Sequence, residues 1–209
     1  MRFTDLDAVT LDAYGTLVGL ADPVPKLQSG LRALGVERDA EAVARAFAKE
    51  VAYYREHSFE GSDDQSLHRL RRDCVAIILG DLSVPDLEPE AFVEGFVAAM
   101  RFELLPGAAA ALHALRRRGL ALAVVSNWDF ELPARLRGLG LDDLVVVTSA
   151  QTGAPKPEPA VFRRALDLLH VRPERALHVG DSDADEAGAR AAGMNFVPAP
   201  LPAAVEALA

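Results

Sequence analysis

Four short polar clusters in the sequence contain side chains that commonly do chemistry: carboxylates, hydroxyls, an amide and an ammonium group. The clusters are Asp12-Ala13-Tyr14-Gly15-Thr16-Leu17, Ser126-Asn127-Trp128-Asp129, Gly153-Ala154-Pro155-Lys156-Pro157 and Gly180-Asp181-Ser182-Asp183-Ala184-Asp185. Such aspartates can act as a nucleophile or bind a hard cation, and such donors can bind an anion. Any one cluster, taken singly, is more often a helix cap than a site. All four together, in this order, indicate one catalytic site.

Apolar, β-favouring runs predict the strands that position these clusters. The runs are residues 8–11, 120–125, 144–148, 176–179 and, more weakly, 195–197. Helical apolar spacing separates the later runs, at residues 107–118, 133–139, 158–170 and 183–192. Strands that alternate with helices predict an α/β fold with a parallel sheet covered on both faces. Ligands bind such a sheet at the carboxyl ends of its strands, where the polar clusters fall.

The first strand is followed by about 85 residues with almost no strand signal, as judged from helix and turn cues. Segments 39–57, 63–79 and 89–101 have helical spacing, with Asp39 and Asp63 as N-caps and Gly80 as a stop. We therefore expect a mostly helical insertion over residues 18–104. The core is then formed by residues 1–17 and 105–209, and the insertion is expected to lie over the carboxyl edge of the sheet as a lid.

The composition limits the partners that the protein can have. The chain of 209 residues is 50% hydrophobic and 25% charged, as in a soluble globular protein, and its net charge of -9 disfavours nucleic acid. No apolar run reaches membrane-spanning length, and the N-terminus carries acids where a signal peptide is basic. The single Cys74 fits a reducing cytoplasm. We expect a cytoplasmic protein with a small anionic ligand or a metal ion; the sequence carries no signal for its oligomeric state.

The four clusters resemble the motifs of the haloacid dehalogenase superfamily of aspartate-nucleophile hydrolases. DAYGTL is similar to the first motif, VSN to the second, GAPKP to the lysine motif, and GDSDAD to the acidic motif of the magnesium-dependent phosphatases. The resemblance covers the whole core. It implies a three-layer, Rossmann-like parallel sheet with a helical cap inserted after the first motif. The motifs are specific for the superfamily but not for a substrate.

The resemblance also implies roles for the charged residues. Asp12 would attack phosphorus and become an aspartyl phosphate, which water then hydrolyses. Mg²⁺ would be held by Asp12, the backbone carbonyl of Tyr14 and Asp181, with Asp185 bound directly or through water. Lys156 would place its ammonium group between the phosphoryl group and the crowded carboxylates. These hard oxygen ligands are the ones that magnesium prefers.

The remaining roles concern the phosphate group. By the same resemblance, Ser126 and Asn127 would donate hydrogen bonds to its non-bridging oxygens, and Thr16 would add another. The predicted activity is that of a magnesium-dependent phosphatase acting on small phosphate monoesters.

One position departs from the pattern of those phosphatases. They usually carry a second aspartate two residues after the nucleophile, and here that residue is Tyr14. A phenol with a reference pKa of about 10 is a poor general base at neutral pH. DAYGTL is also similar to the superfamily's metal-independent 2-haloacid dehalogenases, which attack carbon and release halide. Against that alternative, Asp181 beside Asp12 without a cation would raise the pKa of the nucleophile. A second alternative is a non-catalytic ligand-binding relative.

Two further polar residues have competing interpretations. Asp129 could replace the missing base, although an N-cap for the helix that follows is the more common use of such a residue. His178 lies within a predicted strand, where a histidine is more often a core residue with satisfied hydrogen bonds than a ligand.

Overall fold

The computed structural model describes residues 3–208, and its contacts divide the chain into two units. One unit runs to Gly19 and resumes at Glu103, and the other spans Leu20–Phe102. The first unit contains a five-stranded sheet in the order β5-β4-β1-β6-β7. Its strands are β1 (Ala8–Leu11), β4 (Ala121–Ser126), β5 (Val145–Thr148), β6 (Ala176–Gly180) and β7 (Asn195–Pro198).

All neighbouring strands in this sheet are parallel, and β1 lies at its centre. Thr10 of β1 pairs with Ala123 of β4 on one side and with His178 of β6 on the other. All four residues of β1 are buried, as expected for a parallel strand that is covered on both faces. The predicted α/β class is therefore confirmed. Because β1 is the central strand, the residue that follows it lies at the middle of the sheet's carboxyl edge.

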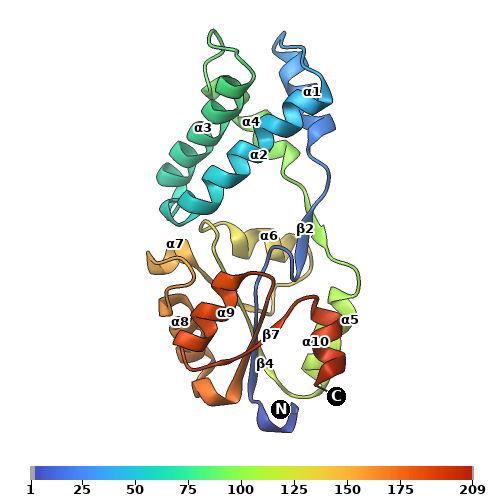
Figure 1. The fold of residues 1–209 in the computed structure, drawn as a ribbon, viewed down its shortest axis with the longest axis vertical. Helices are drawn as coiled ribbons and strands as arrows, with labels where there is room; N and C mark the ends of the chain where they lie inside the picture. The colour runs from blue at the N-terminus through green and yellow to red at the C-terminus, as the bar shows by residue number, and fades with distance from the viewer. Residues whose placement is uncertain (1–2, 209) are drawn as a thin grey trace. The chain divides into compact units, whose positions relative to one another are not determined.

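Helices cover both faces of the sheet (Figure 1). On one face, α8 (Ala160–Leu169) and α9 (Asp183–Ala191) pack through Phe162 and Ala189 onto a layer of small apolar strand residues. On the other face, α5 (Ala108–Arg117) and α10 (Leu201–Ala207) lie side by side. The short helices α6 (Leu132–Gly138) and α7 (Ser149–Thr152) contact β5 at the edge. The result is a three-layer core.

The second unit is helical. Its helices are α1 (Val24–Ala33), α2 (Ala40–His57), α3 (Asp64–Asp81) and α4 (Glu90–Ala99). Helix α2 packs against α3, and α1 packs against α4. The chain passes between the two units through β2 (Val18–Leu20) and β3 (Phe102–Leu104), which pair with each other. Single 3-10 turns lie at Phe3–Asp5, Ser58–Glu60 and Pro173–Arg175.

The helix ends in this unit test the capping predictions. The Asp39 side chain accepts a hydrogen bond from the Ala42 N–H, and the Asp63 side chain accepts one from Ser66, which confirms both N-caps. The predicted stop at Gly80 is wrong, because α3 continues through it to Asp81. The left-handed residue that follows the helix is Ser83, with φ of 54°.

The sequence also missed α1, α10 and the pair β2 and β3. None of the helices in the described part of the chain has both the length and the apolar content needed to cross a membrane.

Candidate active site

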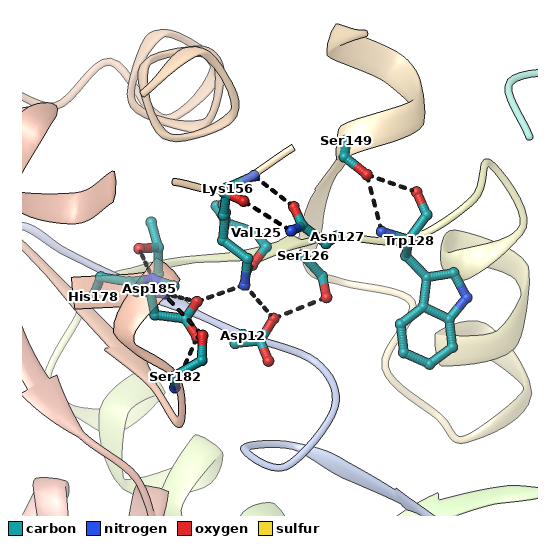
Figure 2. A network of polar contacts seen from close by, with 11 residues as sticks. Asp12, Val125, Ser126, Asn127, Trp128, Ser149, Lys156, His178, Ser182 and Asp185 are labelled. Atoms are coloured by element: carbon teal, nitrogen blue, oxygen red, sulfur yellow. Dashed lines mark hydrogen bonds and ion pairs between the residues drawn. The ribbon is translucent and has the colours of Figure 1, made fainter. Parts of the chain in front are cut away.

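The site begins with Asp12, which follows the central strand directly. Its backbone N–H donates to the Val179 carbonyl of β6, so the strand pairing still holds the backbone at this residue. Asp12 is buried, with 5% of the residue exposed. Its Oδ1 accepts a hydrogen bond of 2.8 Å from the Ser126 hydroxyl at the end of β4 and one of 2.6 Å from the Lys156 ammonium (Figure 2). Asp12 Oδ2 accepts no hydrogen bond from the described residues, so this oxygen is available to attack a substrate.

Among the described residues, Lys156 is the lysine or arginine that contacts the carboxylates of this site. Its Nζ lies 2.6 Å from Asp12 Oδ1 and 2.5 Å from Asp185 Oδ1, and it also donates to the Val125 carbonyl at 3.4 Å. Burial alone would lower the pKa of this ammonium, but the two carboxylates outweigh burial and raise the pKa. Lys156 therefore stays charged and links the nucleophile to the acidic cluster.

The Asn127 side chain fixes the backbone of Lys156. The Lys156 N–H donates to Asn127 Oδ1 at 2.7 Å, and Asn127 Nδ2 donates back to the Lys156 carbonyl at 3.1 Å (Figure 2). The next residue is held as well, because the Trp128 N–H donates to the Ser149 hydroxyl at 3.1 Å and the same hydroxyl donates to the Trp128 carbonyl. The loop after β4 is thus attached to both the lysine loop and the end of β5.

Asp185 is fully buried and uses both of its oxygens. Oδ1 contacts Lys156 and, at 3.0 Å, Nε2 of His178, while Oδ2 accepts from the hydroxyl and the N–H of Ser182 at 2.5 Å and 3.2 Å. Ser182 and Asp185 form the capping box that begins α9. Burial acts to raise the pKa of Asp185, but the His178 hydrogen bond and the Lys156 charge lower it overall. Asp185 is therefore ionised.

Asp181 is exposed and lies against the turn that follows the nucleophile. Gly15 of that turn has φ of 81°, and a Cβ atom at this position would overlap the Asp181 carboxylate, so both the conformation and the approach require glycine. Asp12, Asp181 and Asp185 each offer a carboxylate oxygen, and these oxygens lie within 4.8 Å of one another. Partial desolvation, together with the charges of Asp12 and Asp185, raises the pKa of Asp181.

This charge balance fits a divalent cation. Three carboxylates face one ammonium group, and desolvation together with the charges of Asp12 and Asp185 raises the pKa of Asp181. The donor set consists of hard carboxylate oxygens, which suit magnesium. These residues could therefore hold Mg²⁺.

Thr16 and Tyr14 lie on the same turn but differ in burial. Thr16 is buried, and its hydroxyl has no hydrogen-bond partner among the described residues. Tyr14 is 41% exposed, and its backbone forms an isolated bridge with Val18. Asp129 is buried and accepts from the Glu131 N–H at 2.9 Å, just before α6.

The structure also adds residues that the sequence analysis left outside the site. Ser182 and His178 both contact Asp185, and Thr10 contacts His178. The Ser182-x-x-Asp185 spacing is a capping-box signature, so the sequence contained a signal for Ser182. The contact between Thr10 and His178 depends on the register of β1 against β6, which no local pattern gives.

Comparison with known proteins places this geometry in a family. The family model of the haloacid dehalogenase-like hydrolases matches residues 6–193, which include every residue of the site described above. The chain is a haloacid dehalogenase-like hydrolase.

Relatives of this haloacid dehalogenase-like hydrolase include proteins similar over most of their length. Haloacid dehalogenase-like hydrolase domain-containing protein 3 of Bos taurus is 36% identical over 96% of the chain and 86% of that protein. A phosphoglycolate phosphatase of Rhodospirillum rubrum is 36% identical over 91% of the chain and 78% of that protein. Among solved structures, the L-2-haloacid dehalogenase of Xanthobacter autotrophicus has a TM-score of 0.65 at 24% identity, covering 91% of the chain and 76% of that structure, a likeness of fold.

Proposed function

We propose that this haloacid dehalogenase-like hydrolase is a magnesium-dependent phosphatase that acts on small phosphate monoesters. The observation that carries the proposal is the cluster of Asp12, Asp181 and Asp185, whose oxygens lie within 4.8 Å of one another. The similarity to a phosphoglycolate phosphatase at 36% identity supports the same reaction class. A small anionic substrate follows from this chemistry.

Asp12, Asp181 and Asp185, with the Tyr14 backbone carbonyl, are the residues that would hold Mg²⁺. When bound, the ion offsets the charge of the carboxylates and of the phosphate group, so that two anions can approach each other. Asp185 already accepts four hydrogen bonds, two on each oxygen. Direct binding to the ion would displace some of these bonds, whereas binding through a water molecule would keep them.

The nucleophile in this proposal is Asp12. An oxygen of its carboxylate forms a bond to phosphorus while the bond from phosphorus to the ester oxygen breaks, and the leaving alkoxide takes up a proton. Water then attacks phosphorus and one of its protons passes to solvent, which balances the proton taken up by the alkoxide; the Asp12–phosphorus bond breaks, the carboxylate is restored and inorganic phosphate is released. Ser126 and Lys156 orient Asp12 through their hydrogen bonds to Oδ1.

Three groups stabilise the charge of the phosphate in this scheme. Lys156 supplies a buried ammonium group and the Thr16 hydroxyl supplies a hydrogen bond, while the Ser126 hydroxyl, whose single proton is donated to Asp12 Oδ1 in the structure, would turn to the phosphate once the substrate is bound. The unpartnered Thr16 hydroxyl has full capacity for a ligand oxygen. Asn127 was expected to donate to the phosphate; since both ends of its amide bond the Lys156 backbone, we propose that its side chain holds Lys156 in place.

A metal-independent 2-haloacid dehalogenase is the second candidate, and Tyr14 is the residue that favours it. Tyrosine stands where the phosphatases carry their acid/base aspartate, in a first motif similar to that of the dehalogenases. In this alternative, Asp12 attacks carbon and halide leaves. Asp181 argues against it, because desolvation and the charges of Asp12 and Asp185 raise the pKa of its carboxyl, and a metal-independent reaction leaves these like charges unpaired.

The test is a panel of phosphate monoesters and 2-haloacids, each assayed with magnesium and with a chelator. We expect phosphate release that requires magnesium and falls at least about a thousandfold in Asp12→Asn, which keeps the size of the side chain but not the nucleophile. Asp142→Asn, an exposed aspartate outside the site, is the matched control and should behave as wild type.

Two other outcomes would replace the proposal. Halide release that persists in chelator would establish the dehalogenase reaction. Retained magnesium binding with no turnover on any substrate would identify a non-catalytic ligand-binding relative.

A further inference from the structure

A buried polar pair lies behind the acidic cluster. Thr10 of β1 and His178 of β6 are register partners in the parallel sheet, and both are fully buried. Thr10 Oγ1 lies 2.8 Å from His178 Nδ1, and His178 Nε2 lies 3.0 Å from Asp185 Oδ1. The three side chains thus form a chain of hydrogen bonds that ends at the carboxylate in contact with Lys156. Figure 2 shows the part of it from His178 through Asp185 to Lys156.

The surroundings of this pair are apolar. The edge of the His178 ring meets Phe162 of α8 with ring centroids 4.9 Å apart, and Phe196 of β7 lies at 6.3 Å. A polar ring in such a place costs free energy unless its nitrogens are bonded, and here both are bonded. An apolar pair could fill the same layer, but it would offer no donor to Asp185.

The hydrogen-bond pattern fixes which nitrogen of His178 carries the proton. Asp185 is ionised beside Lys156 and can only accept, so His178 Nε2 donates to it. The apolar surroundings of the ring disfavour a charged imidazolium, so Nδ1 is left as an acceptor and the Thr10 hydroxyl, 2.8 Å away, donates to it.

The contact matters because Asp185 is held from two sides. Ser182 occupies Oδ2, and His178 shares Oδ1 with Lys156. Without the His178 donor, the carboxylate keeps Ser182 but loses the bond that orients Oδ1 towards the lysine. Lys156 would then be placed by Asp12 and its loop alone.

We propose that His178 is a positioning residue, which donates through Nε2 to Asp185 so that this carboxylate holds the Lys156 ammonium group against Asp12. Thr10 supports it by fixing the ring through Nδ1. The expected kinetic consequences rest on the proposed phosphatase function, whereas the hydrogen-bond assignment does not.

The first test reads the protonated nitrogen directly. Long-range ¹H–¹⁵N spectra of histidine-labelled, metal-free protein should show His178 as the neutral Nε2–H tautomer, assigned by the signal that disappears in His178→Gln. The Nδ1–H tautomer would overturn the proposal, because the ring could then not donate to Asp185. This measurement needs neither activity nor a stable variant.

The second test uses matched variants and phosphate release. His178→Gln retains an N–H at the position of Nε2, and His178→Leu removes it. We expect kcat/KM to fall by about 10- to 100-fold in His178→Leu and to be largely retained in His178→Gln. Losing a hydrogen bond that orients an active-site carboxylate typically lowers activity by about this factor. Thr10→Val should lower kcat/KM more than Thr10→Ser, which keeps the hydroxyl.

The outcomes separate the two proposals. If folded His178→Leu matches the wild type, or folded His178→Gln is as impaired as His178→Leu, the positioning role is wrong. If the wild type itself releases no phosphate, the proposed function fails, while the tautomer still decides whether His178 donates to Asp185.

Discussion

At the residue scale, the main departure from the phosphatase pattern is Tyr14. It is 41% exposed on the turn that carries the nucleophile, and a phenol is a weak proton carrier for this step at neutral pH. Tyr14→Asp should raise kcat by about tenfold or more on alkyl phosphates, whose leaving groups need a proton. The rate on nitrophenyl phosphate should change little, because nitrophenolate leaves unassisted.

The control for this prediction is Tyr14→Asn, which has nearly the size of aspartate but cannot carry the proton. If Tyr14→Asp and Tyr14→Asn behave alike on both kinds of substrate, another group supplies the proton. Asp129 would be the next residue to examine, although its carboxylate already accepts a hydrogen bond before α6.

The sequence identifies the types of residue in the site better than their contacts. Asp12, Ser126 and Lys156 were predicted to belong to one site, and in the structure both Ser126 and Lys156 donate hydrogen bonds to Asp12. The engagement of the Asn127 amide with Lys156 and the role of His178 were not predicted. Both depend on how loops and strands distant in sequence are placed, which residue type and local spacing do not encode.

At the element scale, the packing of α2 against α3 buries an acid. Glu50 is 3% exposed, and burial raises its pKa to about 7, although a hydrogen bond from the Cys74 thiol acts in the opposite direction. Between about pH 4.5 and pH 7 the unfolded chain has lost this proton and the folded chain retains it. The free energy of unfolding should therefore fall by about 3 kcal/mol from this group as pH rises through that window.

The measurement is urea denaturation at several pH values. Glu50→Gln keeps the shape of the side chain without the charge, so it should remove most of this decrease and be more stable than wild type at pH 8. Glu56→Gln, an exposed glutamate in the same helix, should leave the dependence unchanged. An equal slope in wild type and Glu50→Gln would show that Glu50 does not hold its proton in the folded state.

The elements that the sequence missed have identifiable physical causes. Helix α1 has Pro25 in its first turn, where proline is well tolerated, but Gly30 in its interior lowers the helix propensity of a ten-residue segment. A Cβ atom at Gly30 would lie 2.8 Å from the Phe92 ring, so glycine allows the close packing of α1 on α4. Gly80 led to the opposite error: it was predicted to end the helix, but α3 continues through it. Tertiary packing decides the case of Gly30, whereas Gly80 is exposed near the end of α3 and a Cβ atom there would meet no neighbour. The long apolar runs of the sheet, by contrast, were recognisable locally.

At the scale of the whole molecule, the site joins distant parts of the chain. Asp12 follows the first strand of the sheet and Asp181 follows β6, with the helical unit Leu20–Phe102 between them in sequence. A cation that binds both carboxylates binds the folded chain and not the unfolded one. At a concentration about 100 times its Kd, such a cation should stabilise the protein by about 2.7 kcal/mol and raise Tm by several degrees.

Asp181→Asn separates this effect from general salt screening of a chain with a net charge of -9. Without magnesium the variant should be slightly more stable than wild type, because it removes a carboxylate whose pKa is raised by desolvation and by the charges of Asp12 and Asp185. With magnesium it should lose most of the Tm increase that wild type shows, whereas Asp142→Asn should retain it. Thermal unfolding with MgCl₂ and with NaCl at equal ionic strength measures both effects. If Asp181→Asn and wild type gain equally from magnesium, the cation binds elsewhere, and the acidic cluster must balance its charge through Lys156 and water alone.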